Sequence, residues 1–157
     1  MKRLTILLLV AFLLGSPAAP ALAYPAGETA VSGAGDLIFP DGATFSGVPL
    51  TGSTFGMGVI VHADGSAEGD FEVLLEGTSL LGQAQFISVV GKISAGTANA
   101  DGSVTFSGTA VLDLGDGTPA TPAVPFSVTV TSEALALIIG ATTLATQALG
   151  DGAITIE

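Results

Sequence analysis

The sequence predicts an all-β fold, a single antiparallel β-barrel of roughly 8–10 short strands, with a two-sheet β-sandwich as the alternative. Three observations predict this fold. Apolar and polar side chains alternate with a period of two in most segments after residue 36, which is typical of half-buried strands. The chain ends on a well-patterned strand that can pair with an early one and leave no exposed edge, which favours the barrel. Turn signals of the Asp-Gly type separate the segments, at Asp41, Asp64, Asp101, Asp116 and Asp151.

The first 23 residues have the composition of a secretory signal peptide. A basic start precedes an apolar run over residues 4–14, which is too short to span a bilayer, and the stretch ends in the small-x-small signal Ala21-Leu22-Ala23. We therefore expect cleavage after Ala23 and a secreted or periplasmic chain of 134 residues. The predicted organisation is a signal peptide over 1–23, a flexible Gly-, Ala- and Ser-rich lead-in over 24–35, and one β domain over 36–157.

Composition and charge limit the classes of molecule that the chain can bind and the interactions that can stabilise its fold. The chain has no cysteine, so no disulfide can form and the hydrophobic core must hold the domain by itself. After the predicted cleavage, Lys92 is the only basic residue against fourteen acidic residues, which gives a net charge of −13 with histidine neutral. A surface this acidic repels nucleic acid and anionic membranes. We expect a protein or surface partner, no nucleic acid and no membrane span in the mature chain.

Two short strands are expected before the best-patterned part of the chain. Residues 36–39 alternate and are halted by the turn Pro40-Asp41-Gly42. Residues 43–50 form a second strand, and Pro49 within it suits an edge better than the middle of a sheet, because proline cannot donate to the ladder.

The alternation on both sides of an Asp-Gly turn predicts a β-hairpin over 54–76, on which the rest of the fold depends. A two-residue turn would place apolar and charged side chains on the same face. A three-residue loop, Ala63–Gly65, with its glycine in the left-handed conformation, pairs His62 with Ser66 and leaves one face dry and the other wet. The dry face then carries Phe55, Met57, Val59, Val61, Ala67, Gly69, Phe71, Val73 and Leu75.

Another extended run, residues 80–93, follows the hairpin, and then the turn motif recurs. The tetrapeptide Ala100–Ser103 copies residues 63–66, which predicts that Asn99 pairs with Ser103 and that the even-numbered residues after it face inward. Extended backward, this register would bring Lys92 inward. Because an unpaired buried ammonium is costly, we expect either a bulge near Gly91 that turns Lys92 outward or a carboxylate beside it.

The last third of the chain predicts a loop and then further strands. Residues 115–125 contain three prolines and form the loop, and residues 126–131 form a clean strand with threonines on its outer face. For residues 133–150 we prefer two strands to a helix, because Gly140 and the pair Thr142-Thr143 disfavour a long helix. Residues 153–157 alternate again and form the closing strand.

Several of these strand and turn residues resemble those of small exported bacterial all-β domains of uncharacterised function. The resemblance spans about Phe55 to Ile156, and it implies an all-β fold and an exported location but no activity. It is carried by Asp64-Gly65-Ser66 with Gly69 and Phe71, by Phe126-x-Val128-x-Val130, and by the run from Leu149 to Ile156.

The only candidate metal ligands lie near the tip of the predicted hairpin. They are His62, the single histidine, together with Glu68 and Asp70 on the wet face. Glu68, Asp70 and Glu72 form an acidic strip that can admit Ca²⁺ or a basic partner. Acids spaced along a strand are far more often a solvated face, so we expect neither a metal nor another cofactor.

Catalysis is poorly supported. The carboxylates of the acidic strip are spaced by about 6.7 Å along the strand, which is comparable with the pair in inverting glycosidases. Such an enzyme also needs a cleft and aromatic platforms, whereas this chain has no Trp and one Tyr. Nucleophilic catalysis lacks a Cys, a G-x-S-x-G motif and any evident partner for the histidine. We expect no catalytic residues.

These observations favour an exported non-enzymatic β domain that acts as a structural or interaction module at the cell surface or in the periplasm. The alternative is a lipocalin-like carrier that holds a small apolar ligand inside the barrel. An interior cavity would favour the carrier. A middle filled by Phe55, Phe71, Phe106 and Phe126 would favour the module.

Overall fold

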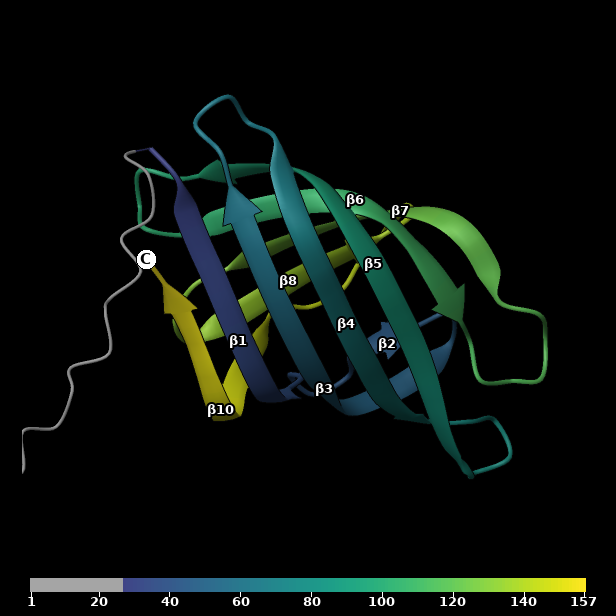
Figure 1. Cartoon of the computed structure of the whole chain (residues 1–157). Coiled ribbons are helices and arrows are strands. Elements are labelled where there is room, and N and C mark those ends of the chain that lie inside the picture. Colours follow the sequence, from purple (N-terminus) through teal and green to yellow (C-terminus); the bar gives the residue numbers. More distant parts are fainter. Residues whose placement is uncertain (1–26) are drawn as a thin grey trace, which may run out of the picture.

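The computed structural model describes residues 27–157, so the predicted signal peptide, 1–23, and the start of the predicted lead-in lie outside the described residues. All ten strands belong to one antiparallel sheet (Figure 1). They are β1 (Thr29–Ile38), β2 (Thr44–Phe45), β3 (Val48–Val61), β4 (Ala67–Thr78), β5 (Ala84–Ala98), β6 (Val104–Asp113), β7 (Thr121–Val130), β8 (Ala134–Ile139), β9 (Thr142–Thr143) and β10 (Gln147–Ile156).

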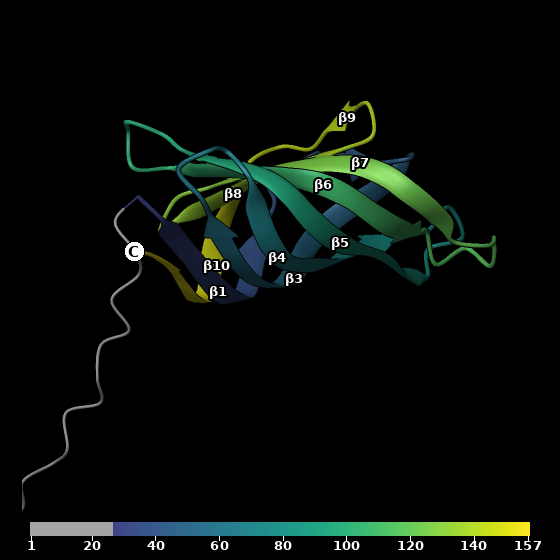
Figure 2. The same ribbon diagram turned by 45° about the horizontal axis from the view of Figure 1, so that its top comes forward.

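Eight of these strands close into a ring. The order β1-β10-β8-β7-β6-β5-β4-β3 returns to β1, because β1 pairs with β10 on one side and with β3 on the other. The short strands β2 and β9 lie outside the ring, on β3 and β8. Figure 1 shows β1, β3 and β4 side by side in one layer, with β7 and β8 crossing behind them at a different slant, and Figure 2 shows the same arrangement turned by 45°. The predicted antiparallel all-β fold is confirmed, as a closed ring that is not a regular barrel.

The central hairpin has the register that the sequence predicts. The N–H of His62 donates to the Ser66 carbonyl at 2.9 Å, and Gly65 has a φ of 84°. Met57 therefore lies opposite Phe71, with both side chains inside the ring. The hairpin is specified twice, by turn chemistry and by the alternation of apolar side chains.

The second turn also forms as predicted, and a bulge decides the position of Lys92. Asn99 pairs with Ser103 as predicted, and its N–H donates to the Ser103 carbonyl at 2.8 Å. The register then shifts between Ile93 and Ala95, a few residues from the expected position near Gly91. Because such a shift reverses which residues face inward, Gly91 occupies the inward position opposite Ala110 and Lys92 faces solvent.

The prediction of a flexible lead-in over 24–35 is wrong from Thr29 onward, where β1 begins. Its glycines indicate flexibility in the sequence, yet in the ring they permit close backbone contact. A Cβ on Gly35 would lie 2.1 Å from the Asp151 carbonyl oxygen of β10, and Gly33 packs tightly against the carbonyl oxygen of Ala153. These glycines therefore permit the close approach of the β10 backbone to β1.

The expected strand over 43–50 is divided by a turn at 46–47 into β2 and the start of β3, and the closing strand expected over 153–157 begins earlier, as β10 at Gln147. Two further boundaries also differ from prediction, and one ambiguous stretch is resolved. The expected loop over 115–125 ends early, because β7 begins at Thr121 and accommodates its prolines beside a register shift. The extended run expected from Leu80 begins only at Ala84, since residues 79–82 form a tight turn. Residues 133–150 form strands rather than a helix, as predicted.

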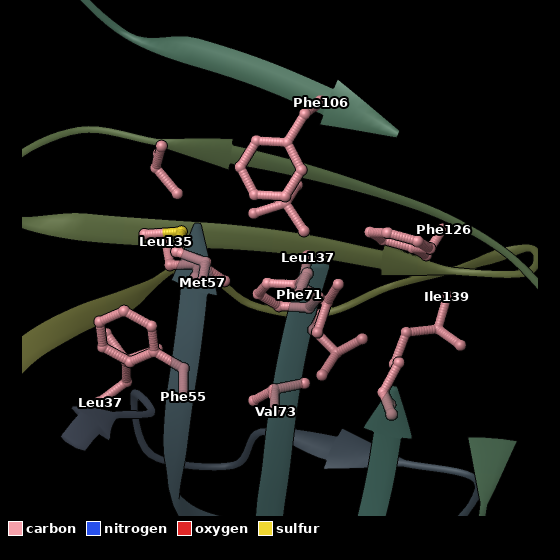
Figure 3. Close-up of a cluster of buried hydrophobic side chains, with 14 of the residues drawn as sticks. Leu37, Phe55, Met57, Phe71, Val73, Phe106, Phe126, Leu135, Leu137 and Ile139 are labelled. Atoms are coloured by element: carbon pink, nitrogen blue, oxygen red, sulfur yellow. The ribbon is translucent and has the colours of Figure 1, made fainter. Parts of the chain in front are cut away.

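Aromatic side chains fill the middle of the ring (Figure 3). Phe71 from β4 stacks on Phe126 from β7 with ring centroids 5.6 Å apart and meets Phe106 from β6 edge-on at 5.8 Å. Phe55 lies lower in the same cluster, and all four rings are at least 96 % buried. Aliphatic side chains from β8, including Leu137, pack against them, so the two layers share one core.

Candidate functional site

The three candidate metal ligands do not converge. His62 lies 3.0 Å from Glu28 through Nδ1 and Oε1, whereas Asp70 accepts a hydrogen bond of 2.6 Å from Lys92 Nζ. Glu68 lies exposed on the outer face of β4. Within residues 27–157, no group of three or more His, Asp or Glu side chains is placed to hold a metal ion. The pairing of His62 with Glu28 escaped sequence reasoning, because Glu28 belongs to the segment expected to be a flexible lead-in.

The acidic strip borders a shallow groove on the outside of the ring. In the β3–β4 register, Glu68 lies opposite Ile60 and Asp70 opposite Gly58, as the sequence predicted. The groove extends from there across β1 to β10, encloses about 490 Å³ and opens to solvent. A Cβ on Gly58 would meet nothing within 4 Å, which shows how little side chain covers this part of the sheet. Its lining comprises Ala30, Val31, Ser32, Gly58, Val59, Ile60, Glu68, Gly69, Thr155 and Glu157.

Three of the Asp-Gly carboxylates accept hydrogen bonds from residues within their own turns. Asp64 accepts hydrogen bonds from the Ser66 hydroxyl at 2.6 Å and the Ser66 N–H at 2.9 Å. These bonds hold the pKa of the Asp64 carboxyl below its usual value, because they favour the charged form. Asp101 with Ser103, and Asp116 with Thr118, repeat the arrangement and the direction of the pKa shift. Turn formation accounts for these aspartates without a bound cation.

The turn between β4 and β5 carries an apolar feature that sequence reasoning missed. Gly82 donates to the Ser79 carbonyl at 2.9 Å, and Ser79 donates to the Gln83 carbonyl at 2.8 Å, as in the two Asp-Gly turns. The tip positions hold Leu80 and Leu81, which are 97 % and 87 % exposed. The signal that could have revealed this turn is the spacing of Ser79 and Gly82, which matches that of His62 and Gly65.

One buried polar pair lies in the core. Ser53 from β3 donates its hydroxyl hydrogen to Gln147 Oε1 from β10 at 2.5 Å, and the Gln147 side chain is fully buried. The Nε2 atom of Gln147 has no hydrogen-bond partner among the described residues. This pair ties the start of β10 to the core, at the place where β10 leaves β8.

The candidate site residues lie in side-chain pairs or on an exposed strand face. The histidine and Asp70 each contact a residue of opposite charge type at the surface, and the acidic strip lies exposed rather than in a dry cleft. Within the same residues, no helix is long and apolar enough to cross a membrane. Comparison with protein-family models, curated proteins and solved structures found no match to this chain. The geometry alone therefore carries the functional argument.

Proposed function

We propose that this chain is an exported, non-enzymatic β domain that acts as a structural or interaction module at the cell surface or in the periplasm, and that its partners bind outside the ring. The observation that carries the proposal is the packing of Phe71 against Phe106 and Phe126. A carrier of the lipocalin type needs a cavity where these rings lie. The filled middle leaves the outer surface as the place for binding.

Two features of the outer surface support this proposal. The open groove beside Glu68 offers a shallow acidic surface, and the two tip leucines of the β4–β5 turn offer exposed apolar area. Adjacent exposed apolar side chains support a protein interaction site at this turn. The basic start, the apolar run and the cleavage signal of residues 1–23 support export.

Native mass spectrometry of the chain purified from its own host tests the proposal. We expect the mass of a chain that begins at Tyr24, with no small apolar ligand bound in stoichiometric amount. At low collision energy we expect additional species in which protein partners stay bound to the chain. A control variant, Phe71→Ala, opens a void and should bind benzene, whereas the natural chain should not. A small apolar molecule retained at one per chain by the natural protein would contradict the proposal and favour the carrier.

A further inference from the structure

The ring closes tightly on one side of β10 and barely on the other. From Val31 to Ile38, β1 is paired with β10 along nearly its whole length. On the opposite side, β8 meets β10 only at Gln147 and Ala148. Beyond them the N–H of Leu149 donates to the Glu133 carbonyl, and no other described residue pairs with this side of β10. Figure 1 shows β10 at the border of its layer, with β8 behind it at another slant.

The backbone groups on this open side can be identified from the ladder. Ala30 and Glu157 exchange both of their N–H···O bonds at 2.9 Å, so they form a hydrogen-bonded pair. In an antiparallel ladder, hydrogen-bonded and non-hydrogen-bonded pairs alternate. Ile156 and Ile154 are therefore non-hydrogen-bonded with respect to β1, and their N–H and C=O groups point away from it, into the open side.

The side chains at this edge leave room for another strand. Ala153 and Thr155 are small and exposed on the outer face, while Ile154 is buried in the core beneath. Residues 150–157 include neither lysine nor proline, which proteins commonly use to block an edge. An extended peptide can add to such an edge through main-chain hydrogen bonds.

The carboxylates at the ends of this edge determine which kind of strand can pair with it. Exposed carboxylates lie at both ends of the open edge, Asp151 at one end and Glu157 at the other. If a second copy of this chain paired antiparallel about Ile154, Asp151 of each copy would lie opposite Glu157 of the other. Like charges directly opposite each other destabilise a ladder, and two chains of net charge −11, or −13 after the predicted cleavage, also repel each other. The edge therefore disfavours its own copy.

We propose that the open edge of β10, from Gly152 to Ile156, binds an extended segment of a partner protein that carries a basic side chain at each end of a short β-forming stretch. This inference rests on the proposed function and names the class of partner. Backbone hydrogen bonds to Ile154 and Ile156 hold the segment, and Asp151 and Glu157 select the basic ends.

A synthetic peptide, Lys-Thr-Val-Thr-Val-Thr-Lys, tests this inference by NMR titration of the mature chain. We expect the amide signals of Ile154 and Ile156 to shift and their hydrogen exchange to slow, with binding that weakens as salt is added. The same peptide with Glu at both ends should bind at least about tenfold more weakly. Equal binding of the two peptides, or shifts confined to the groove or to the β4–β5 turn, would overturn the proposal.

Matched variants separate the backbone contribution from the charges. Ile156→Pro removes an edge N–H, whereas Ile156→Ala loses the side chain and keeps that N–H, so only the proline variant should abolish peptide binding. Asp151→Asn and Glu157→Gln should each weaken binding by about threefold, as for an exposed ion pair, and Glu72→Gln on β4 should leave binding unchanged. The charge variants keep the test decisive if the proline variant does not fold.

The failure of this inference is distinguishable from failure of the proposed function. If the chain carries no small ligand in native mass spectrometry but does not bind the peptide, the proposed role of the β10 edge is contradicted and the proposed function is not. If the natural chain forms a dimer and Ile156→Pro makes it monomeric, the edge binds a second copy of this chain. That result would overturn the inference as well.

Discussion

The ladders β3–β4 and β8–β10 show two extremes of strand pairing in one ring. β3 and β4 pair from Leu50 to Val61, joined by a tight turn, whereas β8 and β10 share only two residue pairs. The first ladder has alternating apolar side chains on both strands and a turn that specifies the register. The second ends after Ala148, and the rest of β10 pairs with β1 alone, in a ladder whose register is interrupted by a bulge near Gly150. The comparison teaches that long, complete ladders hold most of the ring, whereas one side of β10 has a strand partner at only two of its residues among those described.

Truncating an inward side chain in the β3–β4 ladder and another at the open end of β10 should give the largest contrast. Phe71→Ala on β4 removes a ring that contacts two other phenylalanines, and we expect it to lower the free energy of unfolding by about 3–5 kcal/mol. Ile156→Ala on β10 removes a half-buried side chain and should cost no more than about 2 kcal/mol. Urea denaturation measures both. Equal losses would mean that the open end of β10 contributes as much to stability as the β3–β4 ladder.

Two glycines on the β3–β4 ladder sharpen the role of close backbone contact. Gly69 has a φ of 135°, and a Cβ there would lie 2.0 Å from the Gly58 carbonyl oxygen, so Gly69→Ala should cost about 1–3 kcal/mol. Gly58→Ala, on the facing strand, meets open space and should be neutral or slightly stabilising. Thermal unfolding of the two variants checks this difference. A neutral Gly69→Ala would show that the ladder can relax there.

Variants of the buried pair Ser53 and Gln147 test how the start of β10 is fixed to the core, where β10 meets β8. Ser53→Ala leaves Gln147 without its partner, and we expect a loss of about 1–3 kcal/mol. Adding Gln147→Leu removes the orphaned amide and should restore much of that loss. A double-mutant cycle by denaturant unfolding measures the coupling. Strictly additive losses would indicate that the hydrogen bond contributes nothing.

The smallest effect concerns the turns and depends on pH. Hydrogen bonds from Ser103 lower the pKa of Asp101 in the folded state, so their stabilisation is present above the usual aspartate pKa and is lost as pH falls through the lower folded value. Asp101→Asn should therefore reduce the melting temperature slightly at neutral pH and flatten its decline in acid. Ser103→Ala should have the same effect. Unchanged acid profiles in both variants would contradict this explanation.

Local rules predicted the best-patterned part of the fold. The turn at Gly65, its copy at Gly102 and the alternation around Phe71 specify backbone and burial together, so strand register followed from sequence. The part of β1 before residue 36 was missed because glycines such as Gly33 and Gly35 are common in flexible segments, and the close approach of β10 explains them here.

The candidate surfaces were less predictable because they depend on long-range placement. The predicted hairpin register places Glu68 opposite Ile60 and Asp70 opposite Gly58, but it does not reveal the contribution of β1 and β10 to the groove. The exposure of Leu80 depends on a turn that ends before β5 begins. The open edge depends on how far β8 and β10 diverge, which no local pattern in either strand specifies.

Amide hydrogen exchange along β10, measured by NMR on the free mature chain, tests the open edge most directly. The N–H groups of Ala153 and Thr155 point toward β1, so we predict slow exchange for them, with Ile154 and Ile156 exchanging at least about tenfold faster. Equally slow exchange at all four positions would mean that the far side of β10 is already covered, and would contradict this account of where partners bind.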